Sequence, residues 1–423
     1  YPLSKLCWDG SLKKPLVWTS TSGSTGEPFY FPRGHALNWE SSILHQLFFE
    51  NSSLKEKGPT LIIVGFGMGV WIGGLITYQA FEIAARRMDY PISIITPGIN
   101  KIEIFHALRN LSPNFKQTIL VGYPPFIKDI IDETIHERIN LRQLHLRILT
   151  AAEAYTEKFR EYLVKRAGVK NLYLDTLNIY GTADIGTMAW ETPTSILMRR
   201  LTIQNKKMFR EIFSPIEKTP TLAQYNPFFI TFESIKDEIL LSGSNTIPLI
   251  RYAVGDHGGT FNFSDAIEKL KQFNIHFQKE AKKNGLQNNI YKLPFVYVYE
   301  RKDLSVTLYG LQIYPEIIKE ILIEKPFNRF LTGKLTLITK CNKNQNQYLE
   351  INLELKKNKI TNTRLREFVL RKITDNLIIK NSEFRELHHH LGKRVLPKLV
   401  FWPAEHPRYF KPGIKQKWVQ KGG

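Results

Sequence analysis

Cysteine is nearly absent from this sequence: Cys7 and Cys341 are the only two in 423 residues. Two cysteines exclude a framework of several disulfides and a zinc site built on four thiolates. A chain so poor in cysteine fits a reducing compartment, and we expect a cytoplasmic location. The first ten residues lack the basic start and the apolar core of a secretory signal peptide. Because the chain opens on Tyr1 and not on methionine, we expect part of the N-terminal region to be missing.

Several catalytic signatures are also missing. The sequence contains no nucleophile elbow, no H-E-x-x-H and no Cys-x-x-Cys. A Walker phosphate loop would need Lys-Ser or Lys-Thr where Glu27 and Pro28 stand. The histidines at 388–390 are consecutive, and consecutive residues of a helix do not share a face. We therefore expect a solvent-facing helix end there and not a metal site.

One apolar run is long enough to span a bilayer. Residues 61–81 carry no charge, but five glycines in the run would weaken a single helix. We predict a strand at 60–65, a glycine turn and a helix from Trp71 to Arg87, with no membrane span. The turn is not a dinucleotide fingerprint, because Val70 stands where the last glycine would fall.

Charge is unevenly distributed along the chain. Hydrophobic residues make up 43% and charged residues 23%, which is ordinary for a globular protein, and the formal net charge is +20. Residues 301–423 hold 25 Lys and Arg against 11 Asp and Glu, a net charge of +14. A nucleic-acid surface is one interpretation of this basic segment. A solvated basic face, or a lid that attracts a nucleotide, is the interpretation we favour on charge alone.

Hydrophobic patterning predicts an α/β fold with two domains. Between residues 60 and 260, strand-like runs such as "TLIIVGF", "QTILVGY" and "LHLRILTA" alternate with amphipathic segments, which indicates a mainly parallel sheet covered by helices. After residue 301 the order is strand, helix, strand hairpin, two helices and a last strand "KLVFW", a small α+β pattern of the ferredoxin-like kind. We expect a core domain at 1–299 and a small basic lid domain at 300–423.

Three glycine-containing loops are candidates for phosphate and nucleotide binding. "TSTSGSTGEP" at 19–28 offers backbone N–H groups and hydroxyls to an anion, although a flexible linker has the same composition. "NIYGTADIG" at 178–186 ends a strand beside Asp184, a natural Mg²⁺ ligand. "PLIRYAVGDHGG" at 248–259 places Asp256 in a glycine turn, where a carboxylate can accept both ribose hydroxyls. Each loop alone is weak evidence, but three in this order are harder to attribute to coincidence.

Taken together, these stretches resemble the adenylate-forming superfamily of acyl coenzyme A synthetases, and within it the phenylacetate coenzyme A ligase branch. Ser22-Gly23-Ser24-Thr25-Gly26 resembles its phosphate loop, Ala152-Glu153 its Gly-Ala-Glu segment, and Tyr180 to Asp184 its Tyr-Gly-x-Thr/Ser-Glu. "RYAVGD" and "ERKDLSVTLYGLQIYP" resemble the ribose motif and the interdomain hinge, and "VGFGMGVWIGG" resembles the glycine-aromatic run of the branch beside its acyl pocket.

The resemblance implies that a carboxylate reacts with ATP to give acyl-AMP, and that a thiol then takes the acyl group. The implied cofactors are ATP, Mg²⁺ and coenzyme A, or the phosphopantetheine of an acyl carrier protein, with a small-molecule carboxylic acid as substrate and no specific nucleic acid. An aromatic or arylalkyl acid is favoured. The implied roles in ATP binding are the triphosphate for Thr21, Ser22, Gly23, Ser24, Thr25 and Gly26, adenine stacking for Tyr180 with Glu153 near the base, and the ribose for Asp256 and Arg301; Gly181 and Thr182 also bind ATP. The other implied roles are Mg²⁺ binding by Asp184, a hinge at Asp303, and a substrate pocket formed by Phe66, Gly67, Trp71, Tyr123 and Ala152.

A lysine near the C-terminus is implied as the catalytic residue of adenylation. Lys415 follows Gly413 in a Gly-x-Lys context and is our choice, with Lys417 and Lys411 as alternatives. The chain departs from the family pattern at Asp184, which is a glutamate in the family, and at Ala183, which is usually a hydroxyl residue. Transfer to a carrier protein or another acceptor remains open, as does a non-catalytic relative that binds nucleotides or nucleic acid.

Overall fold

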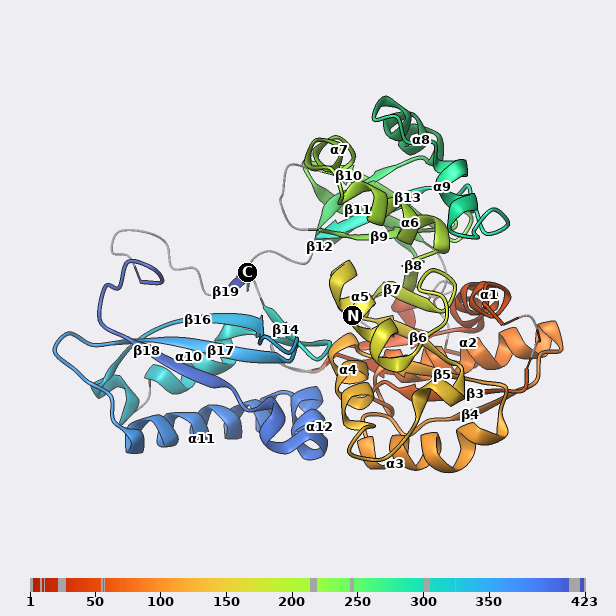
Figure 1. Cartoon of the computed structure of the whole chain (residues 1–423). Helices are drawn as coiled ribbons and strands as arrows, with labels where there is room; N and C mark the ends of the chain where they lie inside the picture. The colour runs from red at the N-terminus through yellow and green to blue at the C-terminus, as the bar shows by residue number, and fades with distance from the viewer. Residues whose placement is uncertain are drawn as a thin grey trace. The chain divides into compact units, whose positions relative to one another are not determined.

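The chain divides into two compact units, one formed by residues 1–19 and 30–300 and the other by residues 20–29 and 301–423. In Figure 1 the first unit runs from red to green and most of the second is blue. The computed structural model describes residues 3–7, 10, 12–21, 28–54, 56, 58–213, 219–243, 247–299, 305–323, 325–410 and 419–421. A short hairpin, β1 (Val17–Ser20) with β2 (Tyr30–Arg33), stands near the start of the chain.

An 11-stranded sheet forms the centre of the first unit. Its parallel part consists of five neighbouring strands, in the order β4 (Ile92–Ile95), β3 (Thr60–Gly65), β5 (Gln117–Gly122), β6 (Leu146–Ala151) and β7 (Thr176–Thr182). Every residue of β3 and β5 is buried, because helices cover both faces of a parallel sheet. The strand predicted at 60–65 is confirmed.

Helices pack on the two faces of these parallel strands. The helices of the first unit are α1 (His35–Glu50), α2 (Ile72–Met88), α3 (Lys101–His106), α4 (Pro124–Glu133), α5 (Glu157–Ala167), α6 (Pro193–Thr202), α7 (Lys206–Ile212), α8 (Phe263–Gln272) and α9 (Phe277–Lys283). Side chains of α1 and α2 such as Phe48 and Phe81 form one core with alternate strand residues such as Ile62 and Val121. Local signals set the helix ends: Thr156 caps α5 through the N–H of Phe159, and Gly168 ends it with a positive φ.

The sheet becomes antiparallel beyond β7, which the alternation of strands and helices did not indicate. The antiparallel strands follow in the order β8 (Gly186–Trp190), β9 (Thr221–Gln224), β13 (Phe295–Tyr299), β12 (Leu249–Phe261), β11 (Glu238–Gly243) and β10 (Ile230–Ile235). This antiparallel part of the sheet curls back toward β7. As a result, the ring centroid of Tyr180 on β7 lies 6.2 Å from that of Phe232 on the far strand β10. Buried residues of β8 to β13 form a separate core inside the curl.

The second unit is a small α+β structure. It contains the hairpin β14 (Val306–Leu308) and β15 (Leu311–Ile313), then α10 (Pro315–Ile323), β16 (Leu331–Cys341), β17 (Gln347–Leu355), α11 (Thr363–Lys380), α12 (Ser382–Leu391), β18 (Lys398–Trp402) and β19 (Val419–Lys421). The last four strands form a sheet in the order β18-β17-β16-β19, and α11 lies along one side of it (Figure 1). β16 and β17 are antiparallel, whereas β18 and β19 pair in parallel with their neighbours. The helix, hairpin, two helices and strand "KLVFW" occur in the predicted order, but the first predicted strand is the hairpin β14-β15, and "KLVFW" is not the last strand because β19 follows it.

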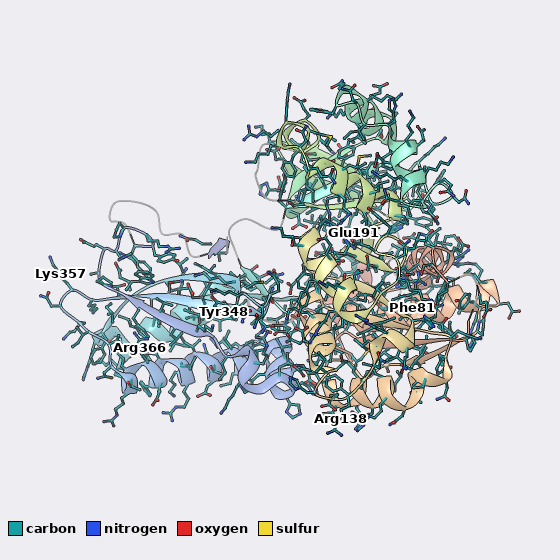
Figure 2. The ribbon with its side chains drawn as sticks, in the orientation of Figure 1. Phe81, Arg138, Glu191, Tyr348, Lys357 and Arg366 are labelled. Atoms are coloured by element: carbon teal, nitrogen blue, oxygen red, sulfur yellow. The ribbon has the colours of Figure 1, made fainter. Side chains whose placement is uncertain are left out.

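Side chains of both kinds, buried apolar and exposed basic, can be followed in Figure 2. Phe81 is fully buried in the first unit, whereas Lys357 and Arg366 are exposed on the second (Figure 2). Of the helices that the structure describes, none has the length and apolar composition needed to cross a membrane. The apolar run at 61–81 instead forms β3, a turn and the start of α2.

Candidate functional site

The predicted site residues of the first unit gather where neighbouring parallel strands end. Gly65 at the end of β3 pairs with Gly122 at the end of β5, and Gly122 pairs with Thr150 of β6. Ala151 pairs in turn with Ile179 of β7. The segments after these strands therefore lie along one edge of the sheet, which is where ligands bind in open α/β sheets.

Phe66, Gly67, Trp71 and Tyr123 come together at this edge. The rings of Phe66 and Tyr123 meet edge to face with centroids 4.9 Å apart. A Cβ on Gly67 would lie 2.9 Å from the Trp71 ring, so the glycine is what allows the indole to pack here. Phe66 is 1% exposed and belongs to the core below, and the Trp71 Nε1 is buried with no hydrogen-bond partner among the residues that the structure describes.

The cavity found in the first unit lies at a different place from these aromatics. Ser41 and Leu44 of α1, Met188 and Trp190 of β8, and Phe229 are among the residues that line it. None of the predicted pocket residues contributes to its lining. The substrate-pocket assignment from sequence therefore stays a prediction.

Ala152 and Glu153 form a tight turn after β6. Ala152 has φ of +74°, a left-handed conformation that costs an alanine free energy and persists only when neighbours hold it. The side chain of Asn178 on β7 donates to the Glu153 carbonyl oxygen at 3.1 Å, and its own Oδ1 accepts from the Thr150 hydroxyl at 3.0 Å. Sequence reasoning missed Asn178, although it stands two residues before Tyr180 in a stretch that was singled out.

Tyr180 and Asp256 are bonded to each other. The Tyr180 hydroxyl donates to Asp256 Oδ2 at 2.7 Å, and Asp256 is 8% exposed. The expectation that Asp256 lies in a glycine turn is wrong, because the residue lies inside β12. The strand carries a bulge: Glu238 pairs with His257 but Leu240 pairs with Ala253. The φ of +81° at Gly255 is the kind of conformation such a bulge needs, so this glycine marks a bulge and not a turn.

Asp184 follows β7 and is partly exposed. Its Oδ1 accepts from the Tyr252 hydroxyl at 3.1 Å, and its Oδ2 has no hydrogen-bond partner within the described part of the chain. A partly exposed carboxylate with one free oxygen suits Mg²⁺, which is usually held by one or two carboxylates together with substrate phosphates and water. No cluster of three or more His, Cys, Asp or Glu able to hold a metal occurs among the described residues, so protein groups alone do not complete a metal site.

Arg33 of β2 is a buried neighbour of this turn that sequence reasoning missed. Its guanidinium donates to the backbone carbonyls of Ala183 and Asp184 and to the Thr19 hydroxyl. Burial lowers the pKa of Arg33 to about 10, and the negative charge of Asp184 offsets part of that decrease. Arg33 is therefore charged at neutral pH.

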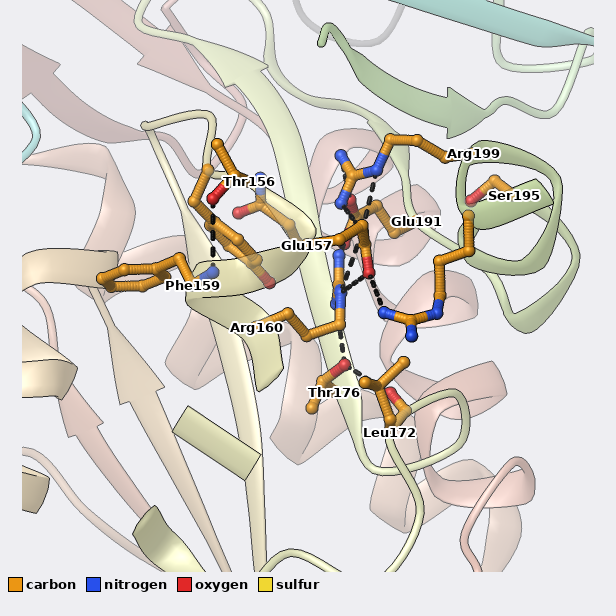
Figure 3. A network of polar contacts seen from close by, with 12 residues as sticks. Thr156, Glu157, Phe159, Arg160, Leu172, Thr176, Glu191, Ser195 and Arg199 are labelled. Atoms are coloured by element: carbon orange, nitrogen blue, oxygen red, sulfur yellow. Dashed lines mark hydrogen bonds and ion pairs between the residues drawn. The ribbon is translucent and has the colours of Figure 1, made fainter. Parts of the chain in front are cut away.

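A network of buried charges joins α5, α6 and the residue that follows β8 (Figure 3). Glu157 at the start of α5 pairs with Arg160 at 3.2 Å and with Arg199 of α6, and Glu191 pairs with Arg160 at 2.6 Å and with Arg199 at 3.0 Å. All four side chains are at most 4% exposed. Burial alone would raise the pKa of Glu157, but Arg160 and Arg199 outweigh it and lower that pKa to about 2.

The remaining predicted residues belong to the second unit or lie outside the described residues. The Thr21 N–H donates to the Phe29 carbonyl at 3.0 Å, and its hydroxyl accepts from the Phe29 N–H at 3.0 Å. The residues outside the described ranges are Ser22, Gly23, Ser24, Thr25, Gly26, Arg301, Asp303, Lys411, Lys415 and Lys417. Their assignments stay predictions from sequence.

Comparison with solved structures shows that the fold is that of adenylate-forming enzymes. A complex of 2-hydroxyisobutyryl-CoA ligase with 2-HIB-AMP and CoA matches with a TM-score of 0.59 and 14% identity, over 100% of this chain and 75% of that chain. A malonyl-CoA ligase complex with methylmalonyl-CoA and AMP matches with a TM-score of 0.50 and 12% identity, over 92% and 71% of the two chains. The amide bond synthetase McbA from Marinactinospora thermotolerans matches with a TM-score of 0.50 and 11% identity, over 91% and 65%.

Comparison of the sequence with protein-family models and with curated proteins finds no match. At 11–14% identity the structural likeness establishes the fold and not the reaction. The predicted α/β fold, with a large helix-covered sheet and a separate small α+β unit, is confirmed.

Proposed function

We propose that this protein is an ATP-dependent acid–thiol ligase that converts a carboxylic acid to acyl-AMP and passes the acyl group to coenzyme A. The observation that carries the proposal is the gathering of Ala152-Glu153 and Tyr180 to Asp184 at the ends of adjacent parallel strands, with Tyr180 bonded to Asp256. Three segments that match nucleotide motifs in sequence thus meet in one region of a fold whose solved relatives include acid–CoA ligases.

The reaction has two halves. In the first, a carboxylate oxygen of the substrate bonds to the α-phosphorus of ATP, the bond from that phosphorus to the bridging oxygen breaks, and pyrophosphate leaves. In the second, a thiolate sulfur bonds to the acyl carbon and AMP leaves. A protein accelerates both steps mainly by positioning the reactants and neutralising charge.

We assign separate tasks in nucleotide binding to the residues predicted from sequence. The Tyr180 ring stacks on adenine beside the turn of Glu153. Asp256 accepts hydrogen bonds from the ribose hydroxyls, and Arg301 donates to them. The loop from Thr21 to Gly26 holds the triphosphate. Gly181 and Thr182, which continue β7, bring the chain to Asp184.

Asp184 is the residue that would hold Mg²⁺, through the carboxylate oxygen that lacks a partner among the described residues. Bound there, Mg²⁺ neutralises part of the triphosphate charge. The second unit supplies Lys415, whose ammonium offsets charge at the α-phosphate, and the hinge at Asp303. As in the phenylacetate coenzyme A ligase branch, we propose an aromatic or arylalkyl acid; a carrier protein is the alternative acceptor.

The test is carboxylate-dependent exchange of labelled pyrophosphate into ATP with Mg²⁺, across aryl, arylalkyl, fatty and amino acids. We expect exchange with aryl or arylalkyl acids, and AMP release when coenzyme A is added. A mock preparation from cells that lack the protein, purified in parallel, controls for contaminating ligases. Nucleotide binding without exchange across the whole panel would contradict the proposed activity.

A further inference from the structure

Arg33 connects two segments that are far apart in the sequence. Its Nε donates to the Thr19 hydroxyl of β1 at 3.0 Å. Its two terminal nitrogens donate to the carbonyl oxygen of Asp184 at 3.2 Å and to that of Ala183, 150 residues away in the chain. Arg33 is 4% exposed and Thr19 is 2% exposed, so water does not compete for these bonds.

The partners of this buried guanidinium are all neutral. Two carbonyls and one hydroxyl accept its bonds, and within the described part of the chain no carboxylate forms an ion pair with it. The Phe31 ring lies 5.0 Å from the guanidinium carbon and adds a cation–π contact. Burying a cation whose hydrogen-bond acceptors are all neutral costs free energy that an apolar side chain would avoid, and the nearby charge of Asp184 offsets only part of that cost. The position of the charge, directly behind the turn of Asp184, therefore calls for an explanation beyond packing.

Over the described ranges, the side chains of the turn that Arg33 holds do not fix its backbone at residue 183, because the Tyr252 hydroxyl bonds the carboxylate of Asp184 and not the backbone. Ala183 is exposed and has no hydroxyl, whereas the Tyr-Gly-x-Thr/Ser-Glu pattern that this stretch resembles has one at that position. The carbonyls of residues 183 and 184 are instead fixed by the fork of the guanidinium, which presents several N–H groups in one plane. β1, on the other side of the fork, leads directly to Thr21.

We propose that Arg33 is a positioning residue for the triphosphate of ATP, locking the turn of Asp184 to β1 so that the carboxylate keeps its place beside the phosphates. This role rests on the proposed function. A purely structural role would change the affinity for every nucleotide equally. The positioning role predicts instead that Arg33 matters for a ligand with β- and γ-phosphates and not for AMP, because Tyr180 and Asp256 hold adenine and ribose. A lysine retains the charge but lacks the planar fork.

The experiment compares binding of Mg-ATP and of AMP to the full chain by calorimetry, for the unmodified protein, Arg33→Met and Arg33→Lys. We expect Arg33→Met to weaken Mg-ATP binding roughly tenfold or more while AMP binding changes less than about twofold, as for loss of hydrogen bonds to a charged group. The Mg-ATP affinity of Arg33→Lys should lie between that of the unmodified protein and that of Arg33→Met. Arg87→Met, at an exposed arginine of α2 in the same unit that bonds Ser42 and Gln46, is the control and should leave the ratio of the two affinities unchanged.

Each outcome decides the assignment. Equal weakening of Mg-ATP and AMP binding in Arg33→Met, or no weakening of either, would overturn the role of Arg33 while leaving the proposed function standing. If Arg33→Met does not fold, judged by circular dichroism, the affinity ratio in Arg33→Lys decides in its place. Absence of binding of both nucleotides to the unmodified protein would overturn the proposed function and this role with it.

Discussion

The hydrogen bond between Tyr180 and Asp256 fixes two side chains from strands that are not neighbours in the sheet. At 2.7 Å it restricts the Tyr180 ring to a narrow range of orientations between β7 and β12. A ring fixed before the ligand arrives loses less entropy on binding. Asn178 acts in the same way on the backbone, because its bond to the Glu153 carbonyl holds the strained turn at Ala152.

The proposed role of Lys415 leads to a prediction for a single residue. Lys415→Ala should reduce pyrophosphate exchange on the order of 100-fold while ATP binding stays within a few-fold, because the ammonium acts mainly on charge that develops in the transition state. Lys398→Ala, at an exposed lysine of β18, is the control and should retain full exchange. Near-normal exchange in Lys415→Ala would move the role to Lys417 or Lys411.

At the scale of elements, buried charges hold α5, α6 and the end of β8 together. Glu157 begins α5, Arg199 lies in α6 and Glu191 follows β8, so the ion network joins elements that local sequence does not connect. Removing one member of a buried network leaves an uncompensated charge, which costs far more than losing a surface pair. The network therefore fixes the start of α5, close to the turn at Ala152 and Glu153.

Arg199→Met should destabilise the protein by about 3–5 kcal/mol, because Glu157 and Glu191 lose a buried partner. Urea unfolding followed by circular dichroism measures the change. The control is Arg86→Met, which removes a solvent-exposed pair with Glu82 within α2 and should cost about 0.5 kcal/mol or less. A cost for Arg199→Met no larger than for this control would show that the network does not stabilise the fold.

His45 of α1 gives the fold a pH dependence of its own. The ring is fully buried beside Phe81, and burial lowers its pKa from 6.5 to about 4. The unfolded chain therefore binds more protons between these values, so stability is complete above pH 6.5 and falls as the pH approaches 4, by up to about 3 kcal/mol. Glu157, with its pKa lowered from 4.5 to about 2, loses its contribution in a lower window.

The measurement for His45 is urea unfolding of the unmodified protein and of His45→Leu at several values between pH 7.5 and 4.5. The unmodified protein should lose stability across this range, and the variant should lose less. Parallel pH profiles for the two proteins would contradict the assignment of this window to His45.

At the scale of the whole molecule, the chain consists of a large sheet-based unit and a smaller basic one. The resemblance to adenylate-forming enzymes implies that the small unit rotates between the two half-reactions about a hinge at Asp303. Conformational steps of this kind often limit turnover. A polyanionic cosubstrate such as coenzyme A suits a basic unit, because opposite charge raises its local concentration.

Asp303→Pro should leave pyrophosphate exchange nearly intact and reduce thioester formation by an order of magnitude or more, because proline fixes φ at the hinge. Separate assays of exchange and of acyl-CoA production measure the two halves. Equal loss of both activities would show that Asp303 is not a hinge between them.

The sequence by itself determined the parallel strands, the helices beside them and the motifs. The apolar run at 61–81 separated into β3 and α2 because its glycines and its period are local properties, and the loops at Ala152 and Tyr180 were recognisable from residue type and order. Only the tertiary structure decided that Tyr180 bonds Asp256, that Arg33 reaches the carbonyls of Ala183 and Asp184, and that the sheet beyond β7 is antiparallel and curled. These features join residues 76 to 151 positions apart, and such contacts are set by how whole elements pack rather than by the preferences of neighbouring residues.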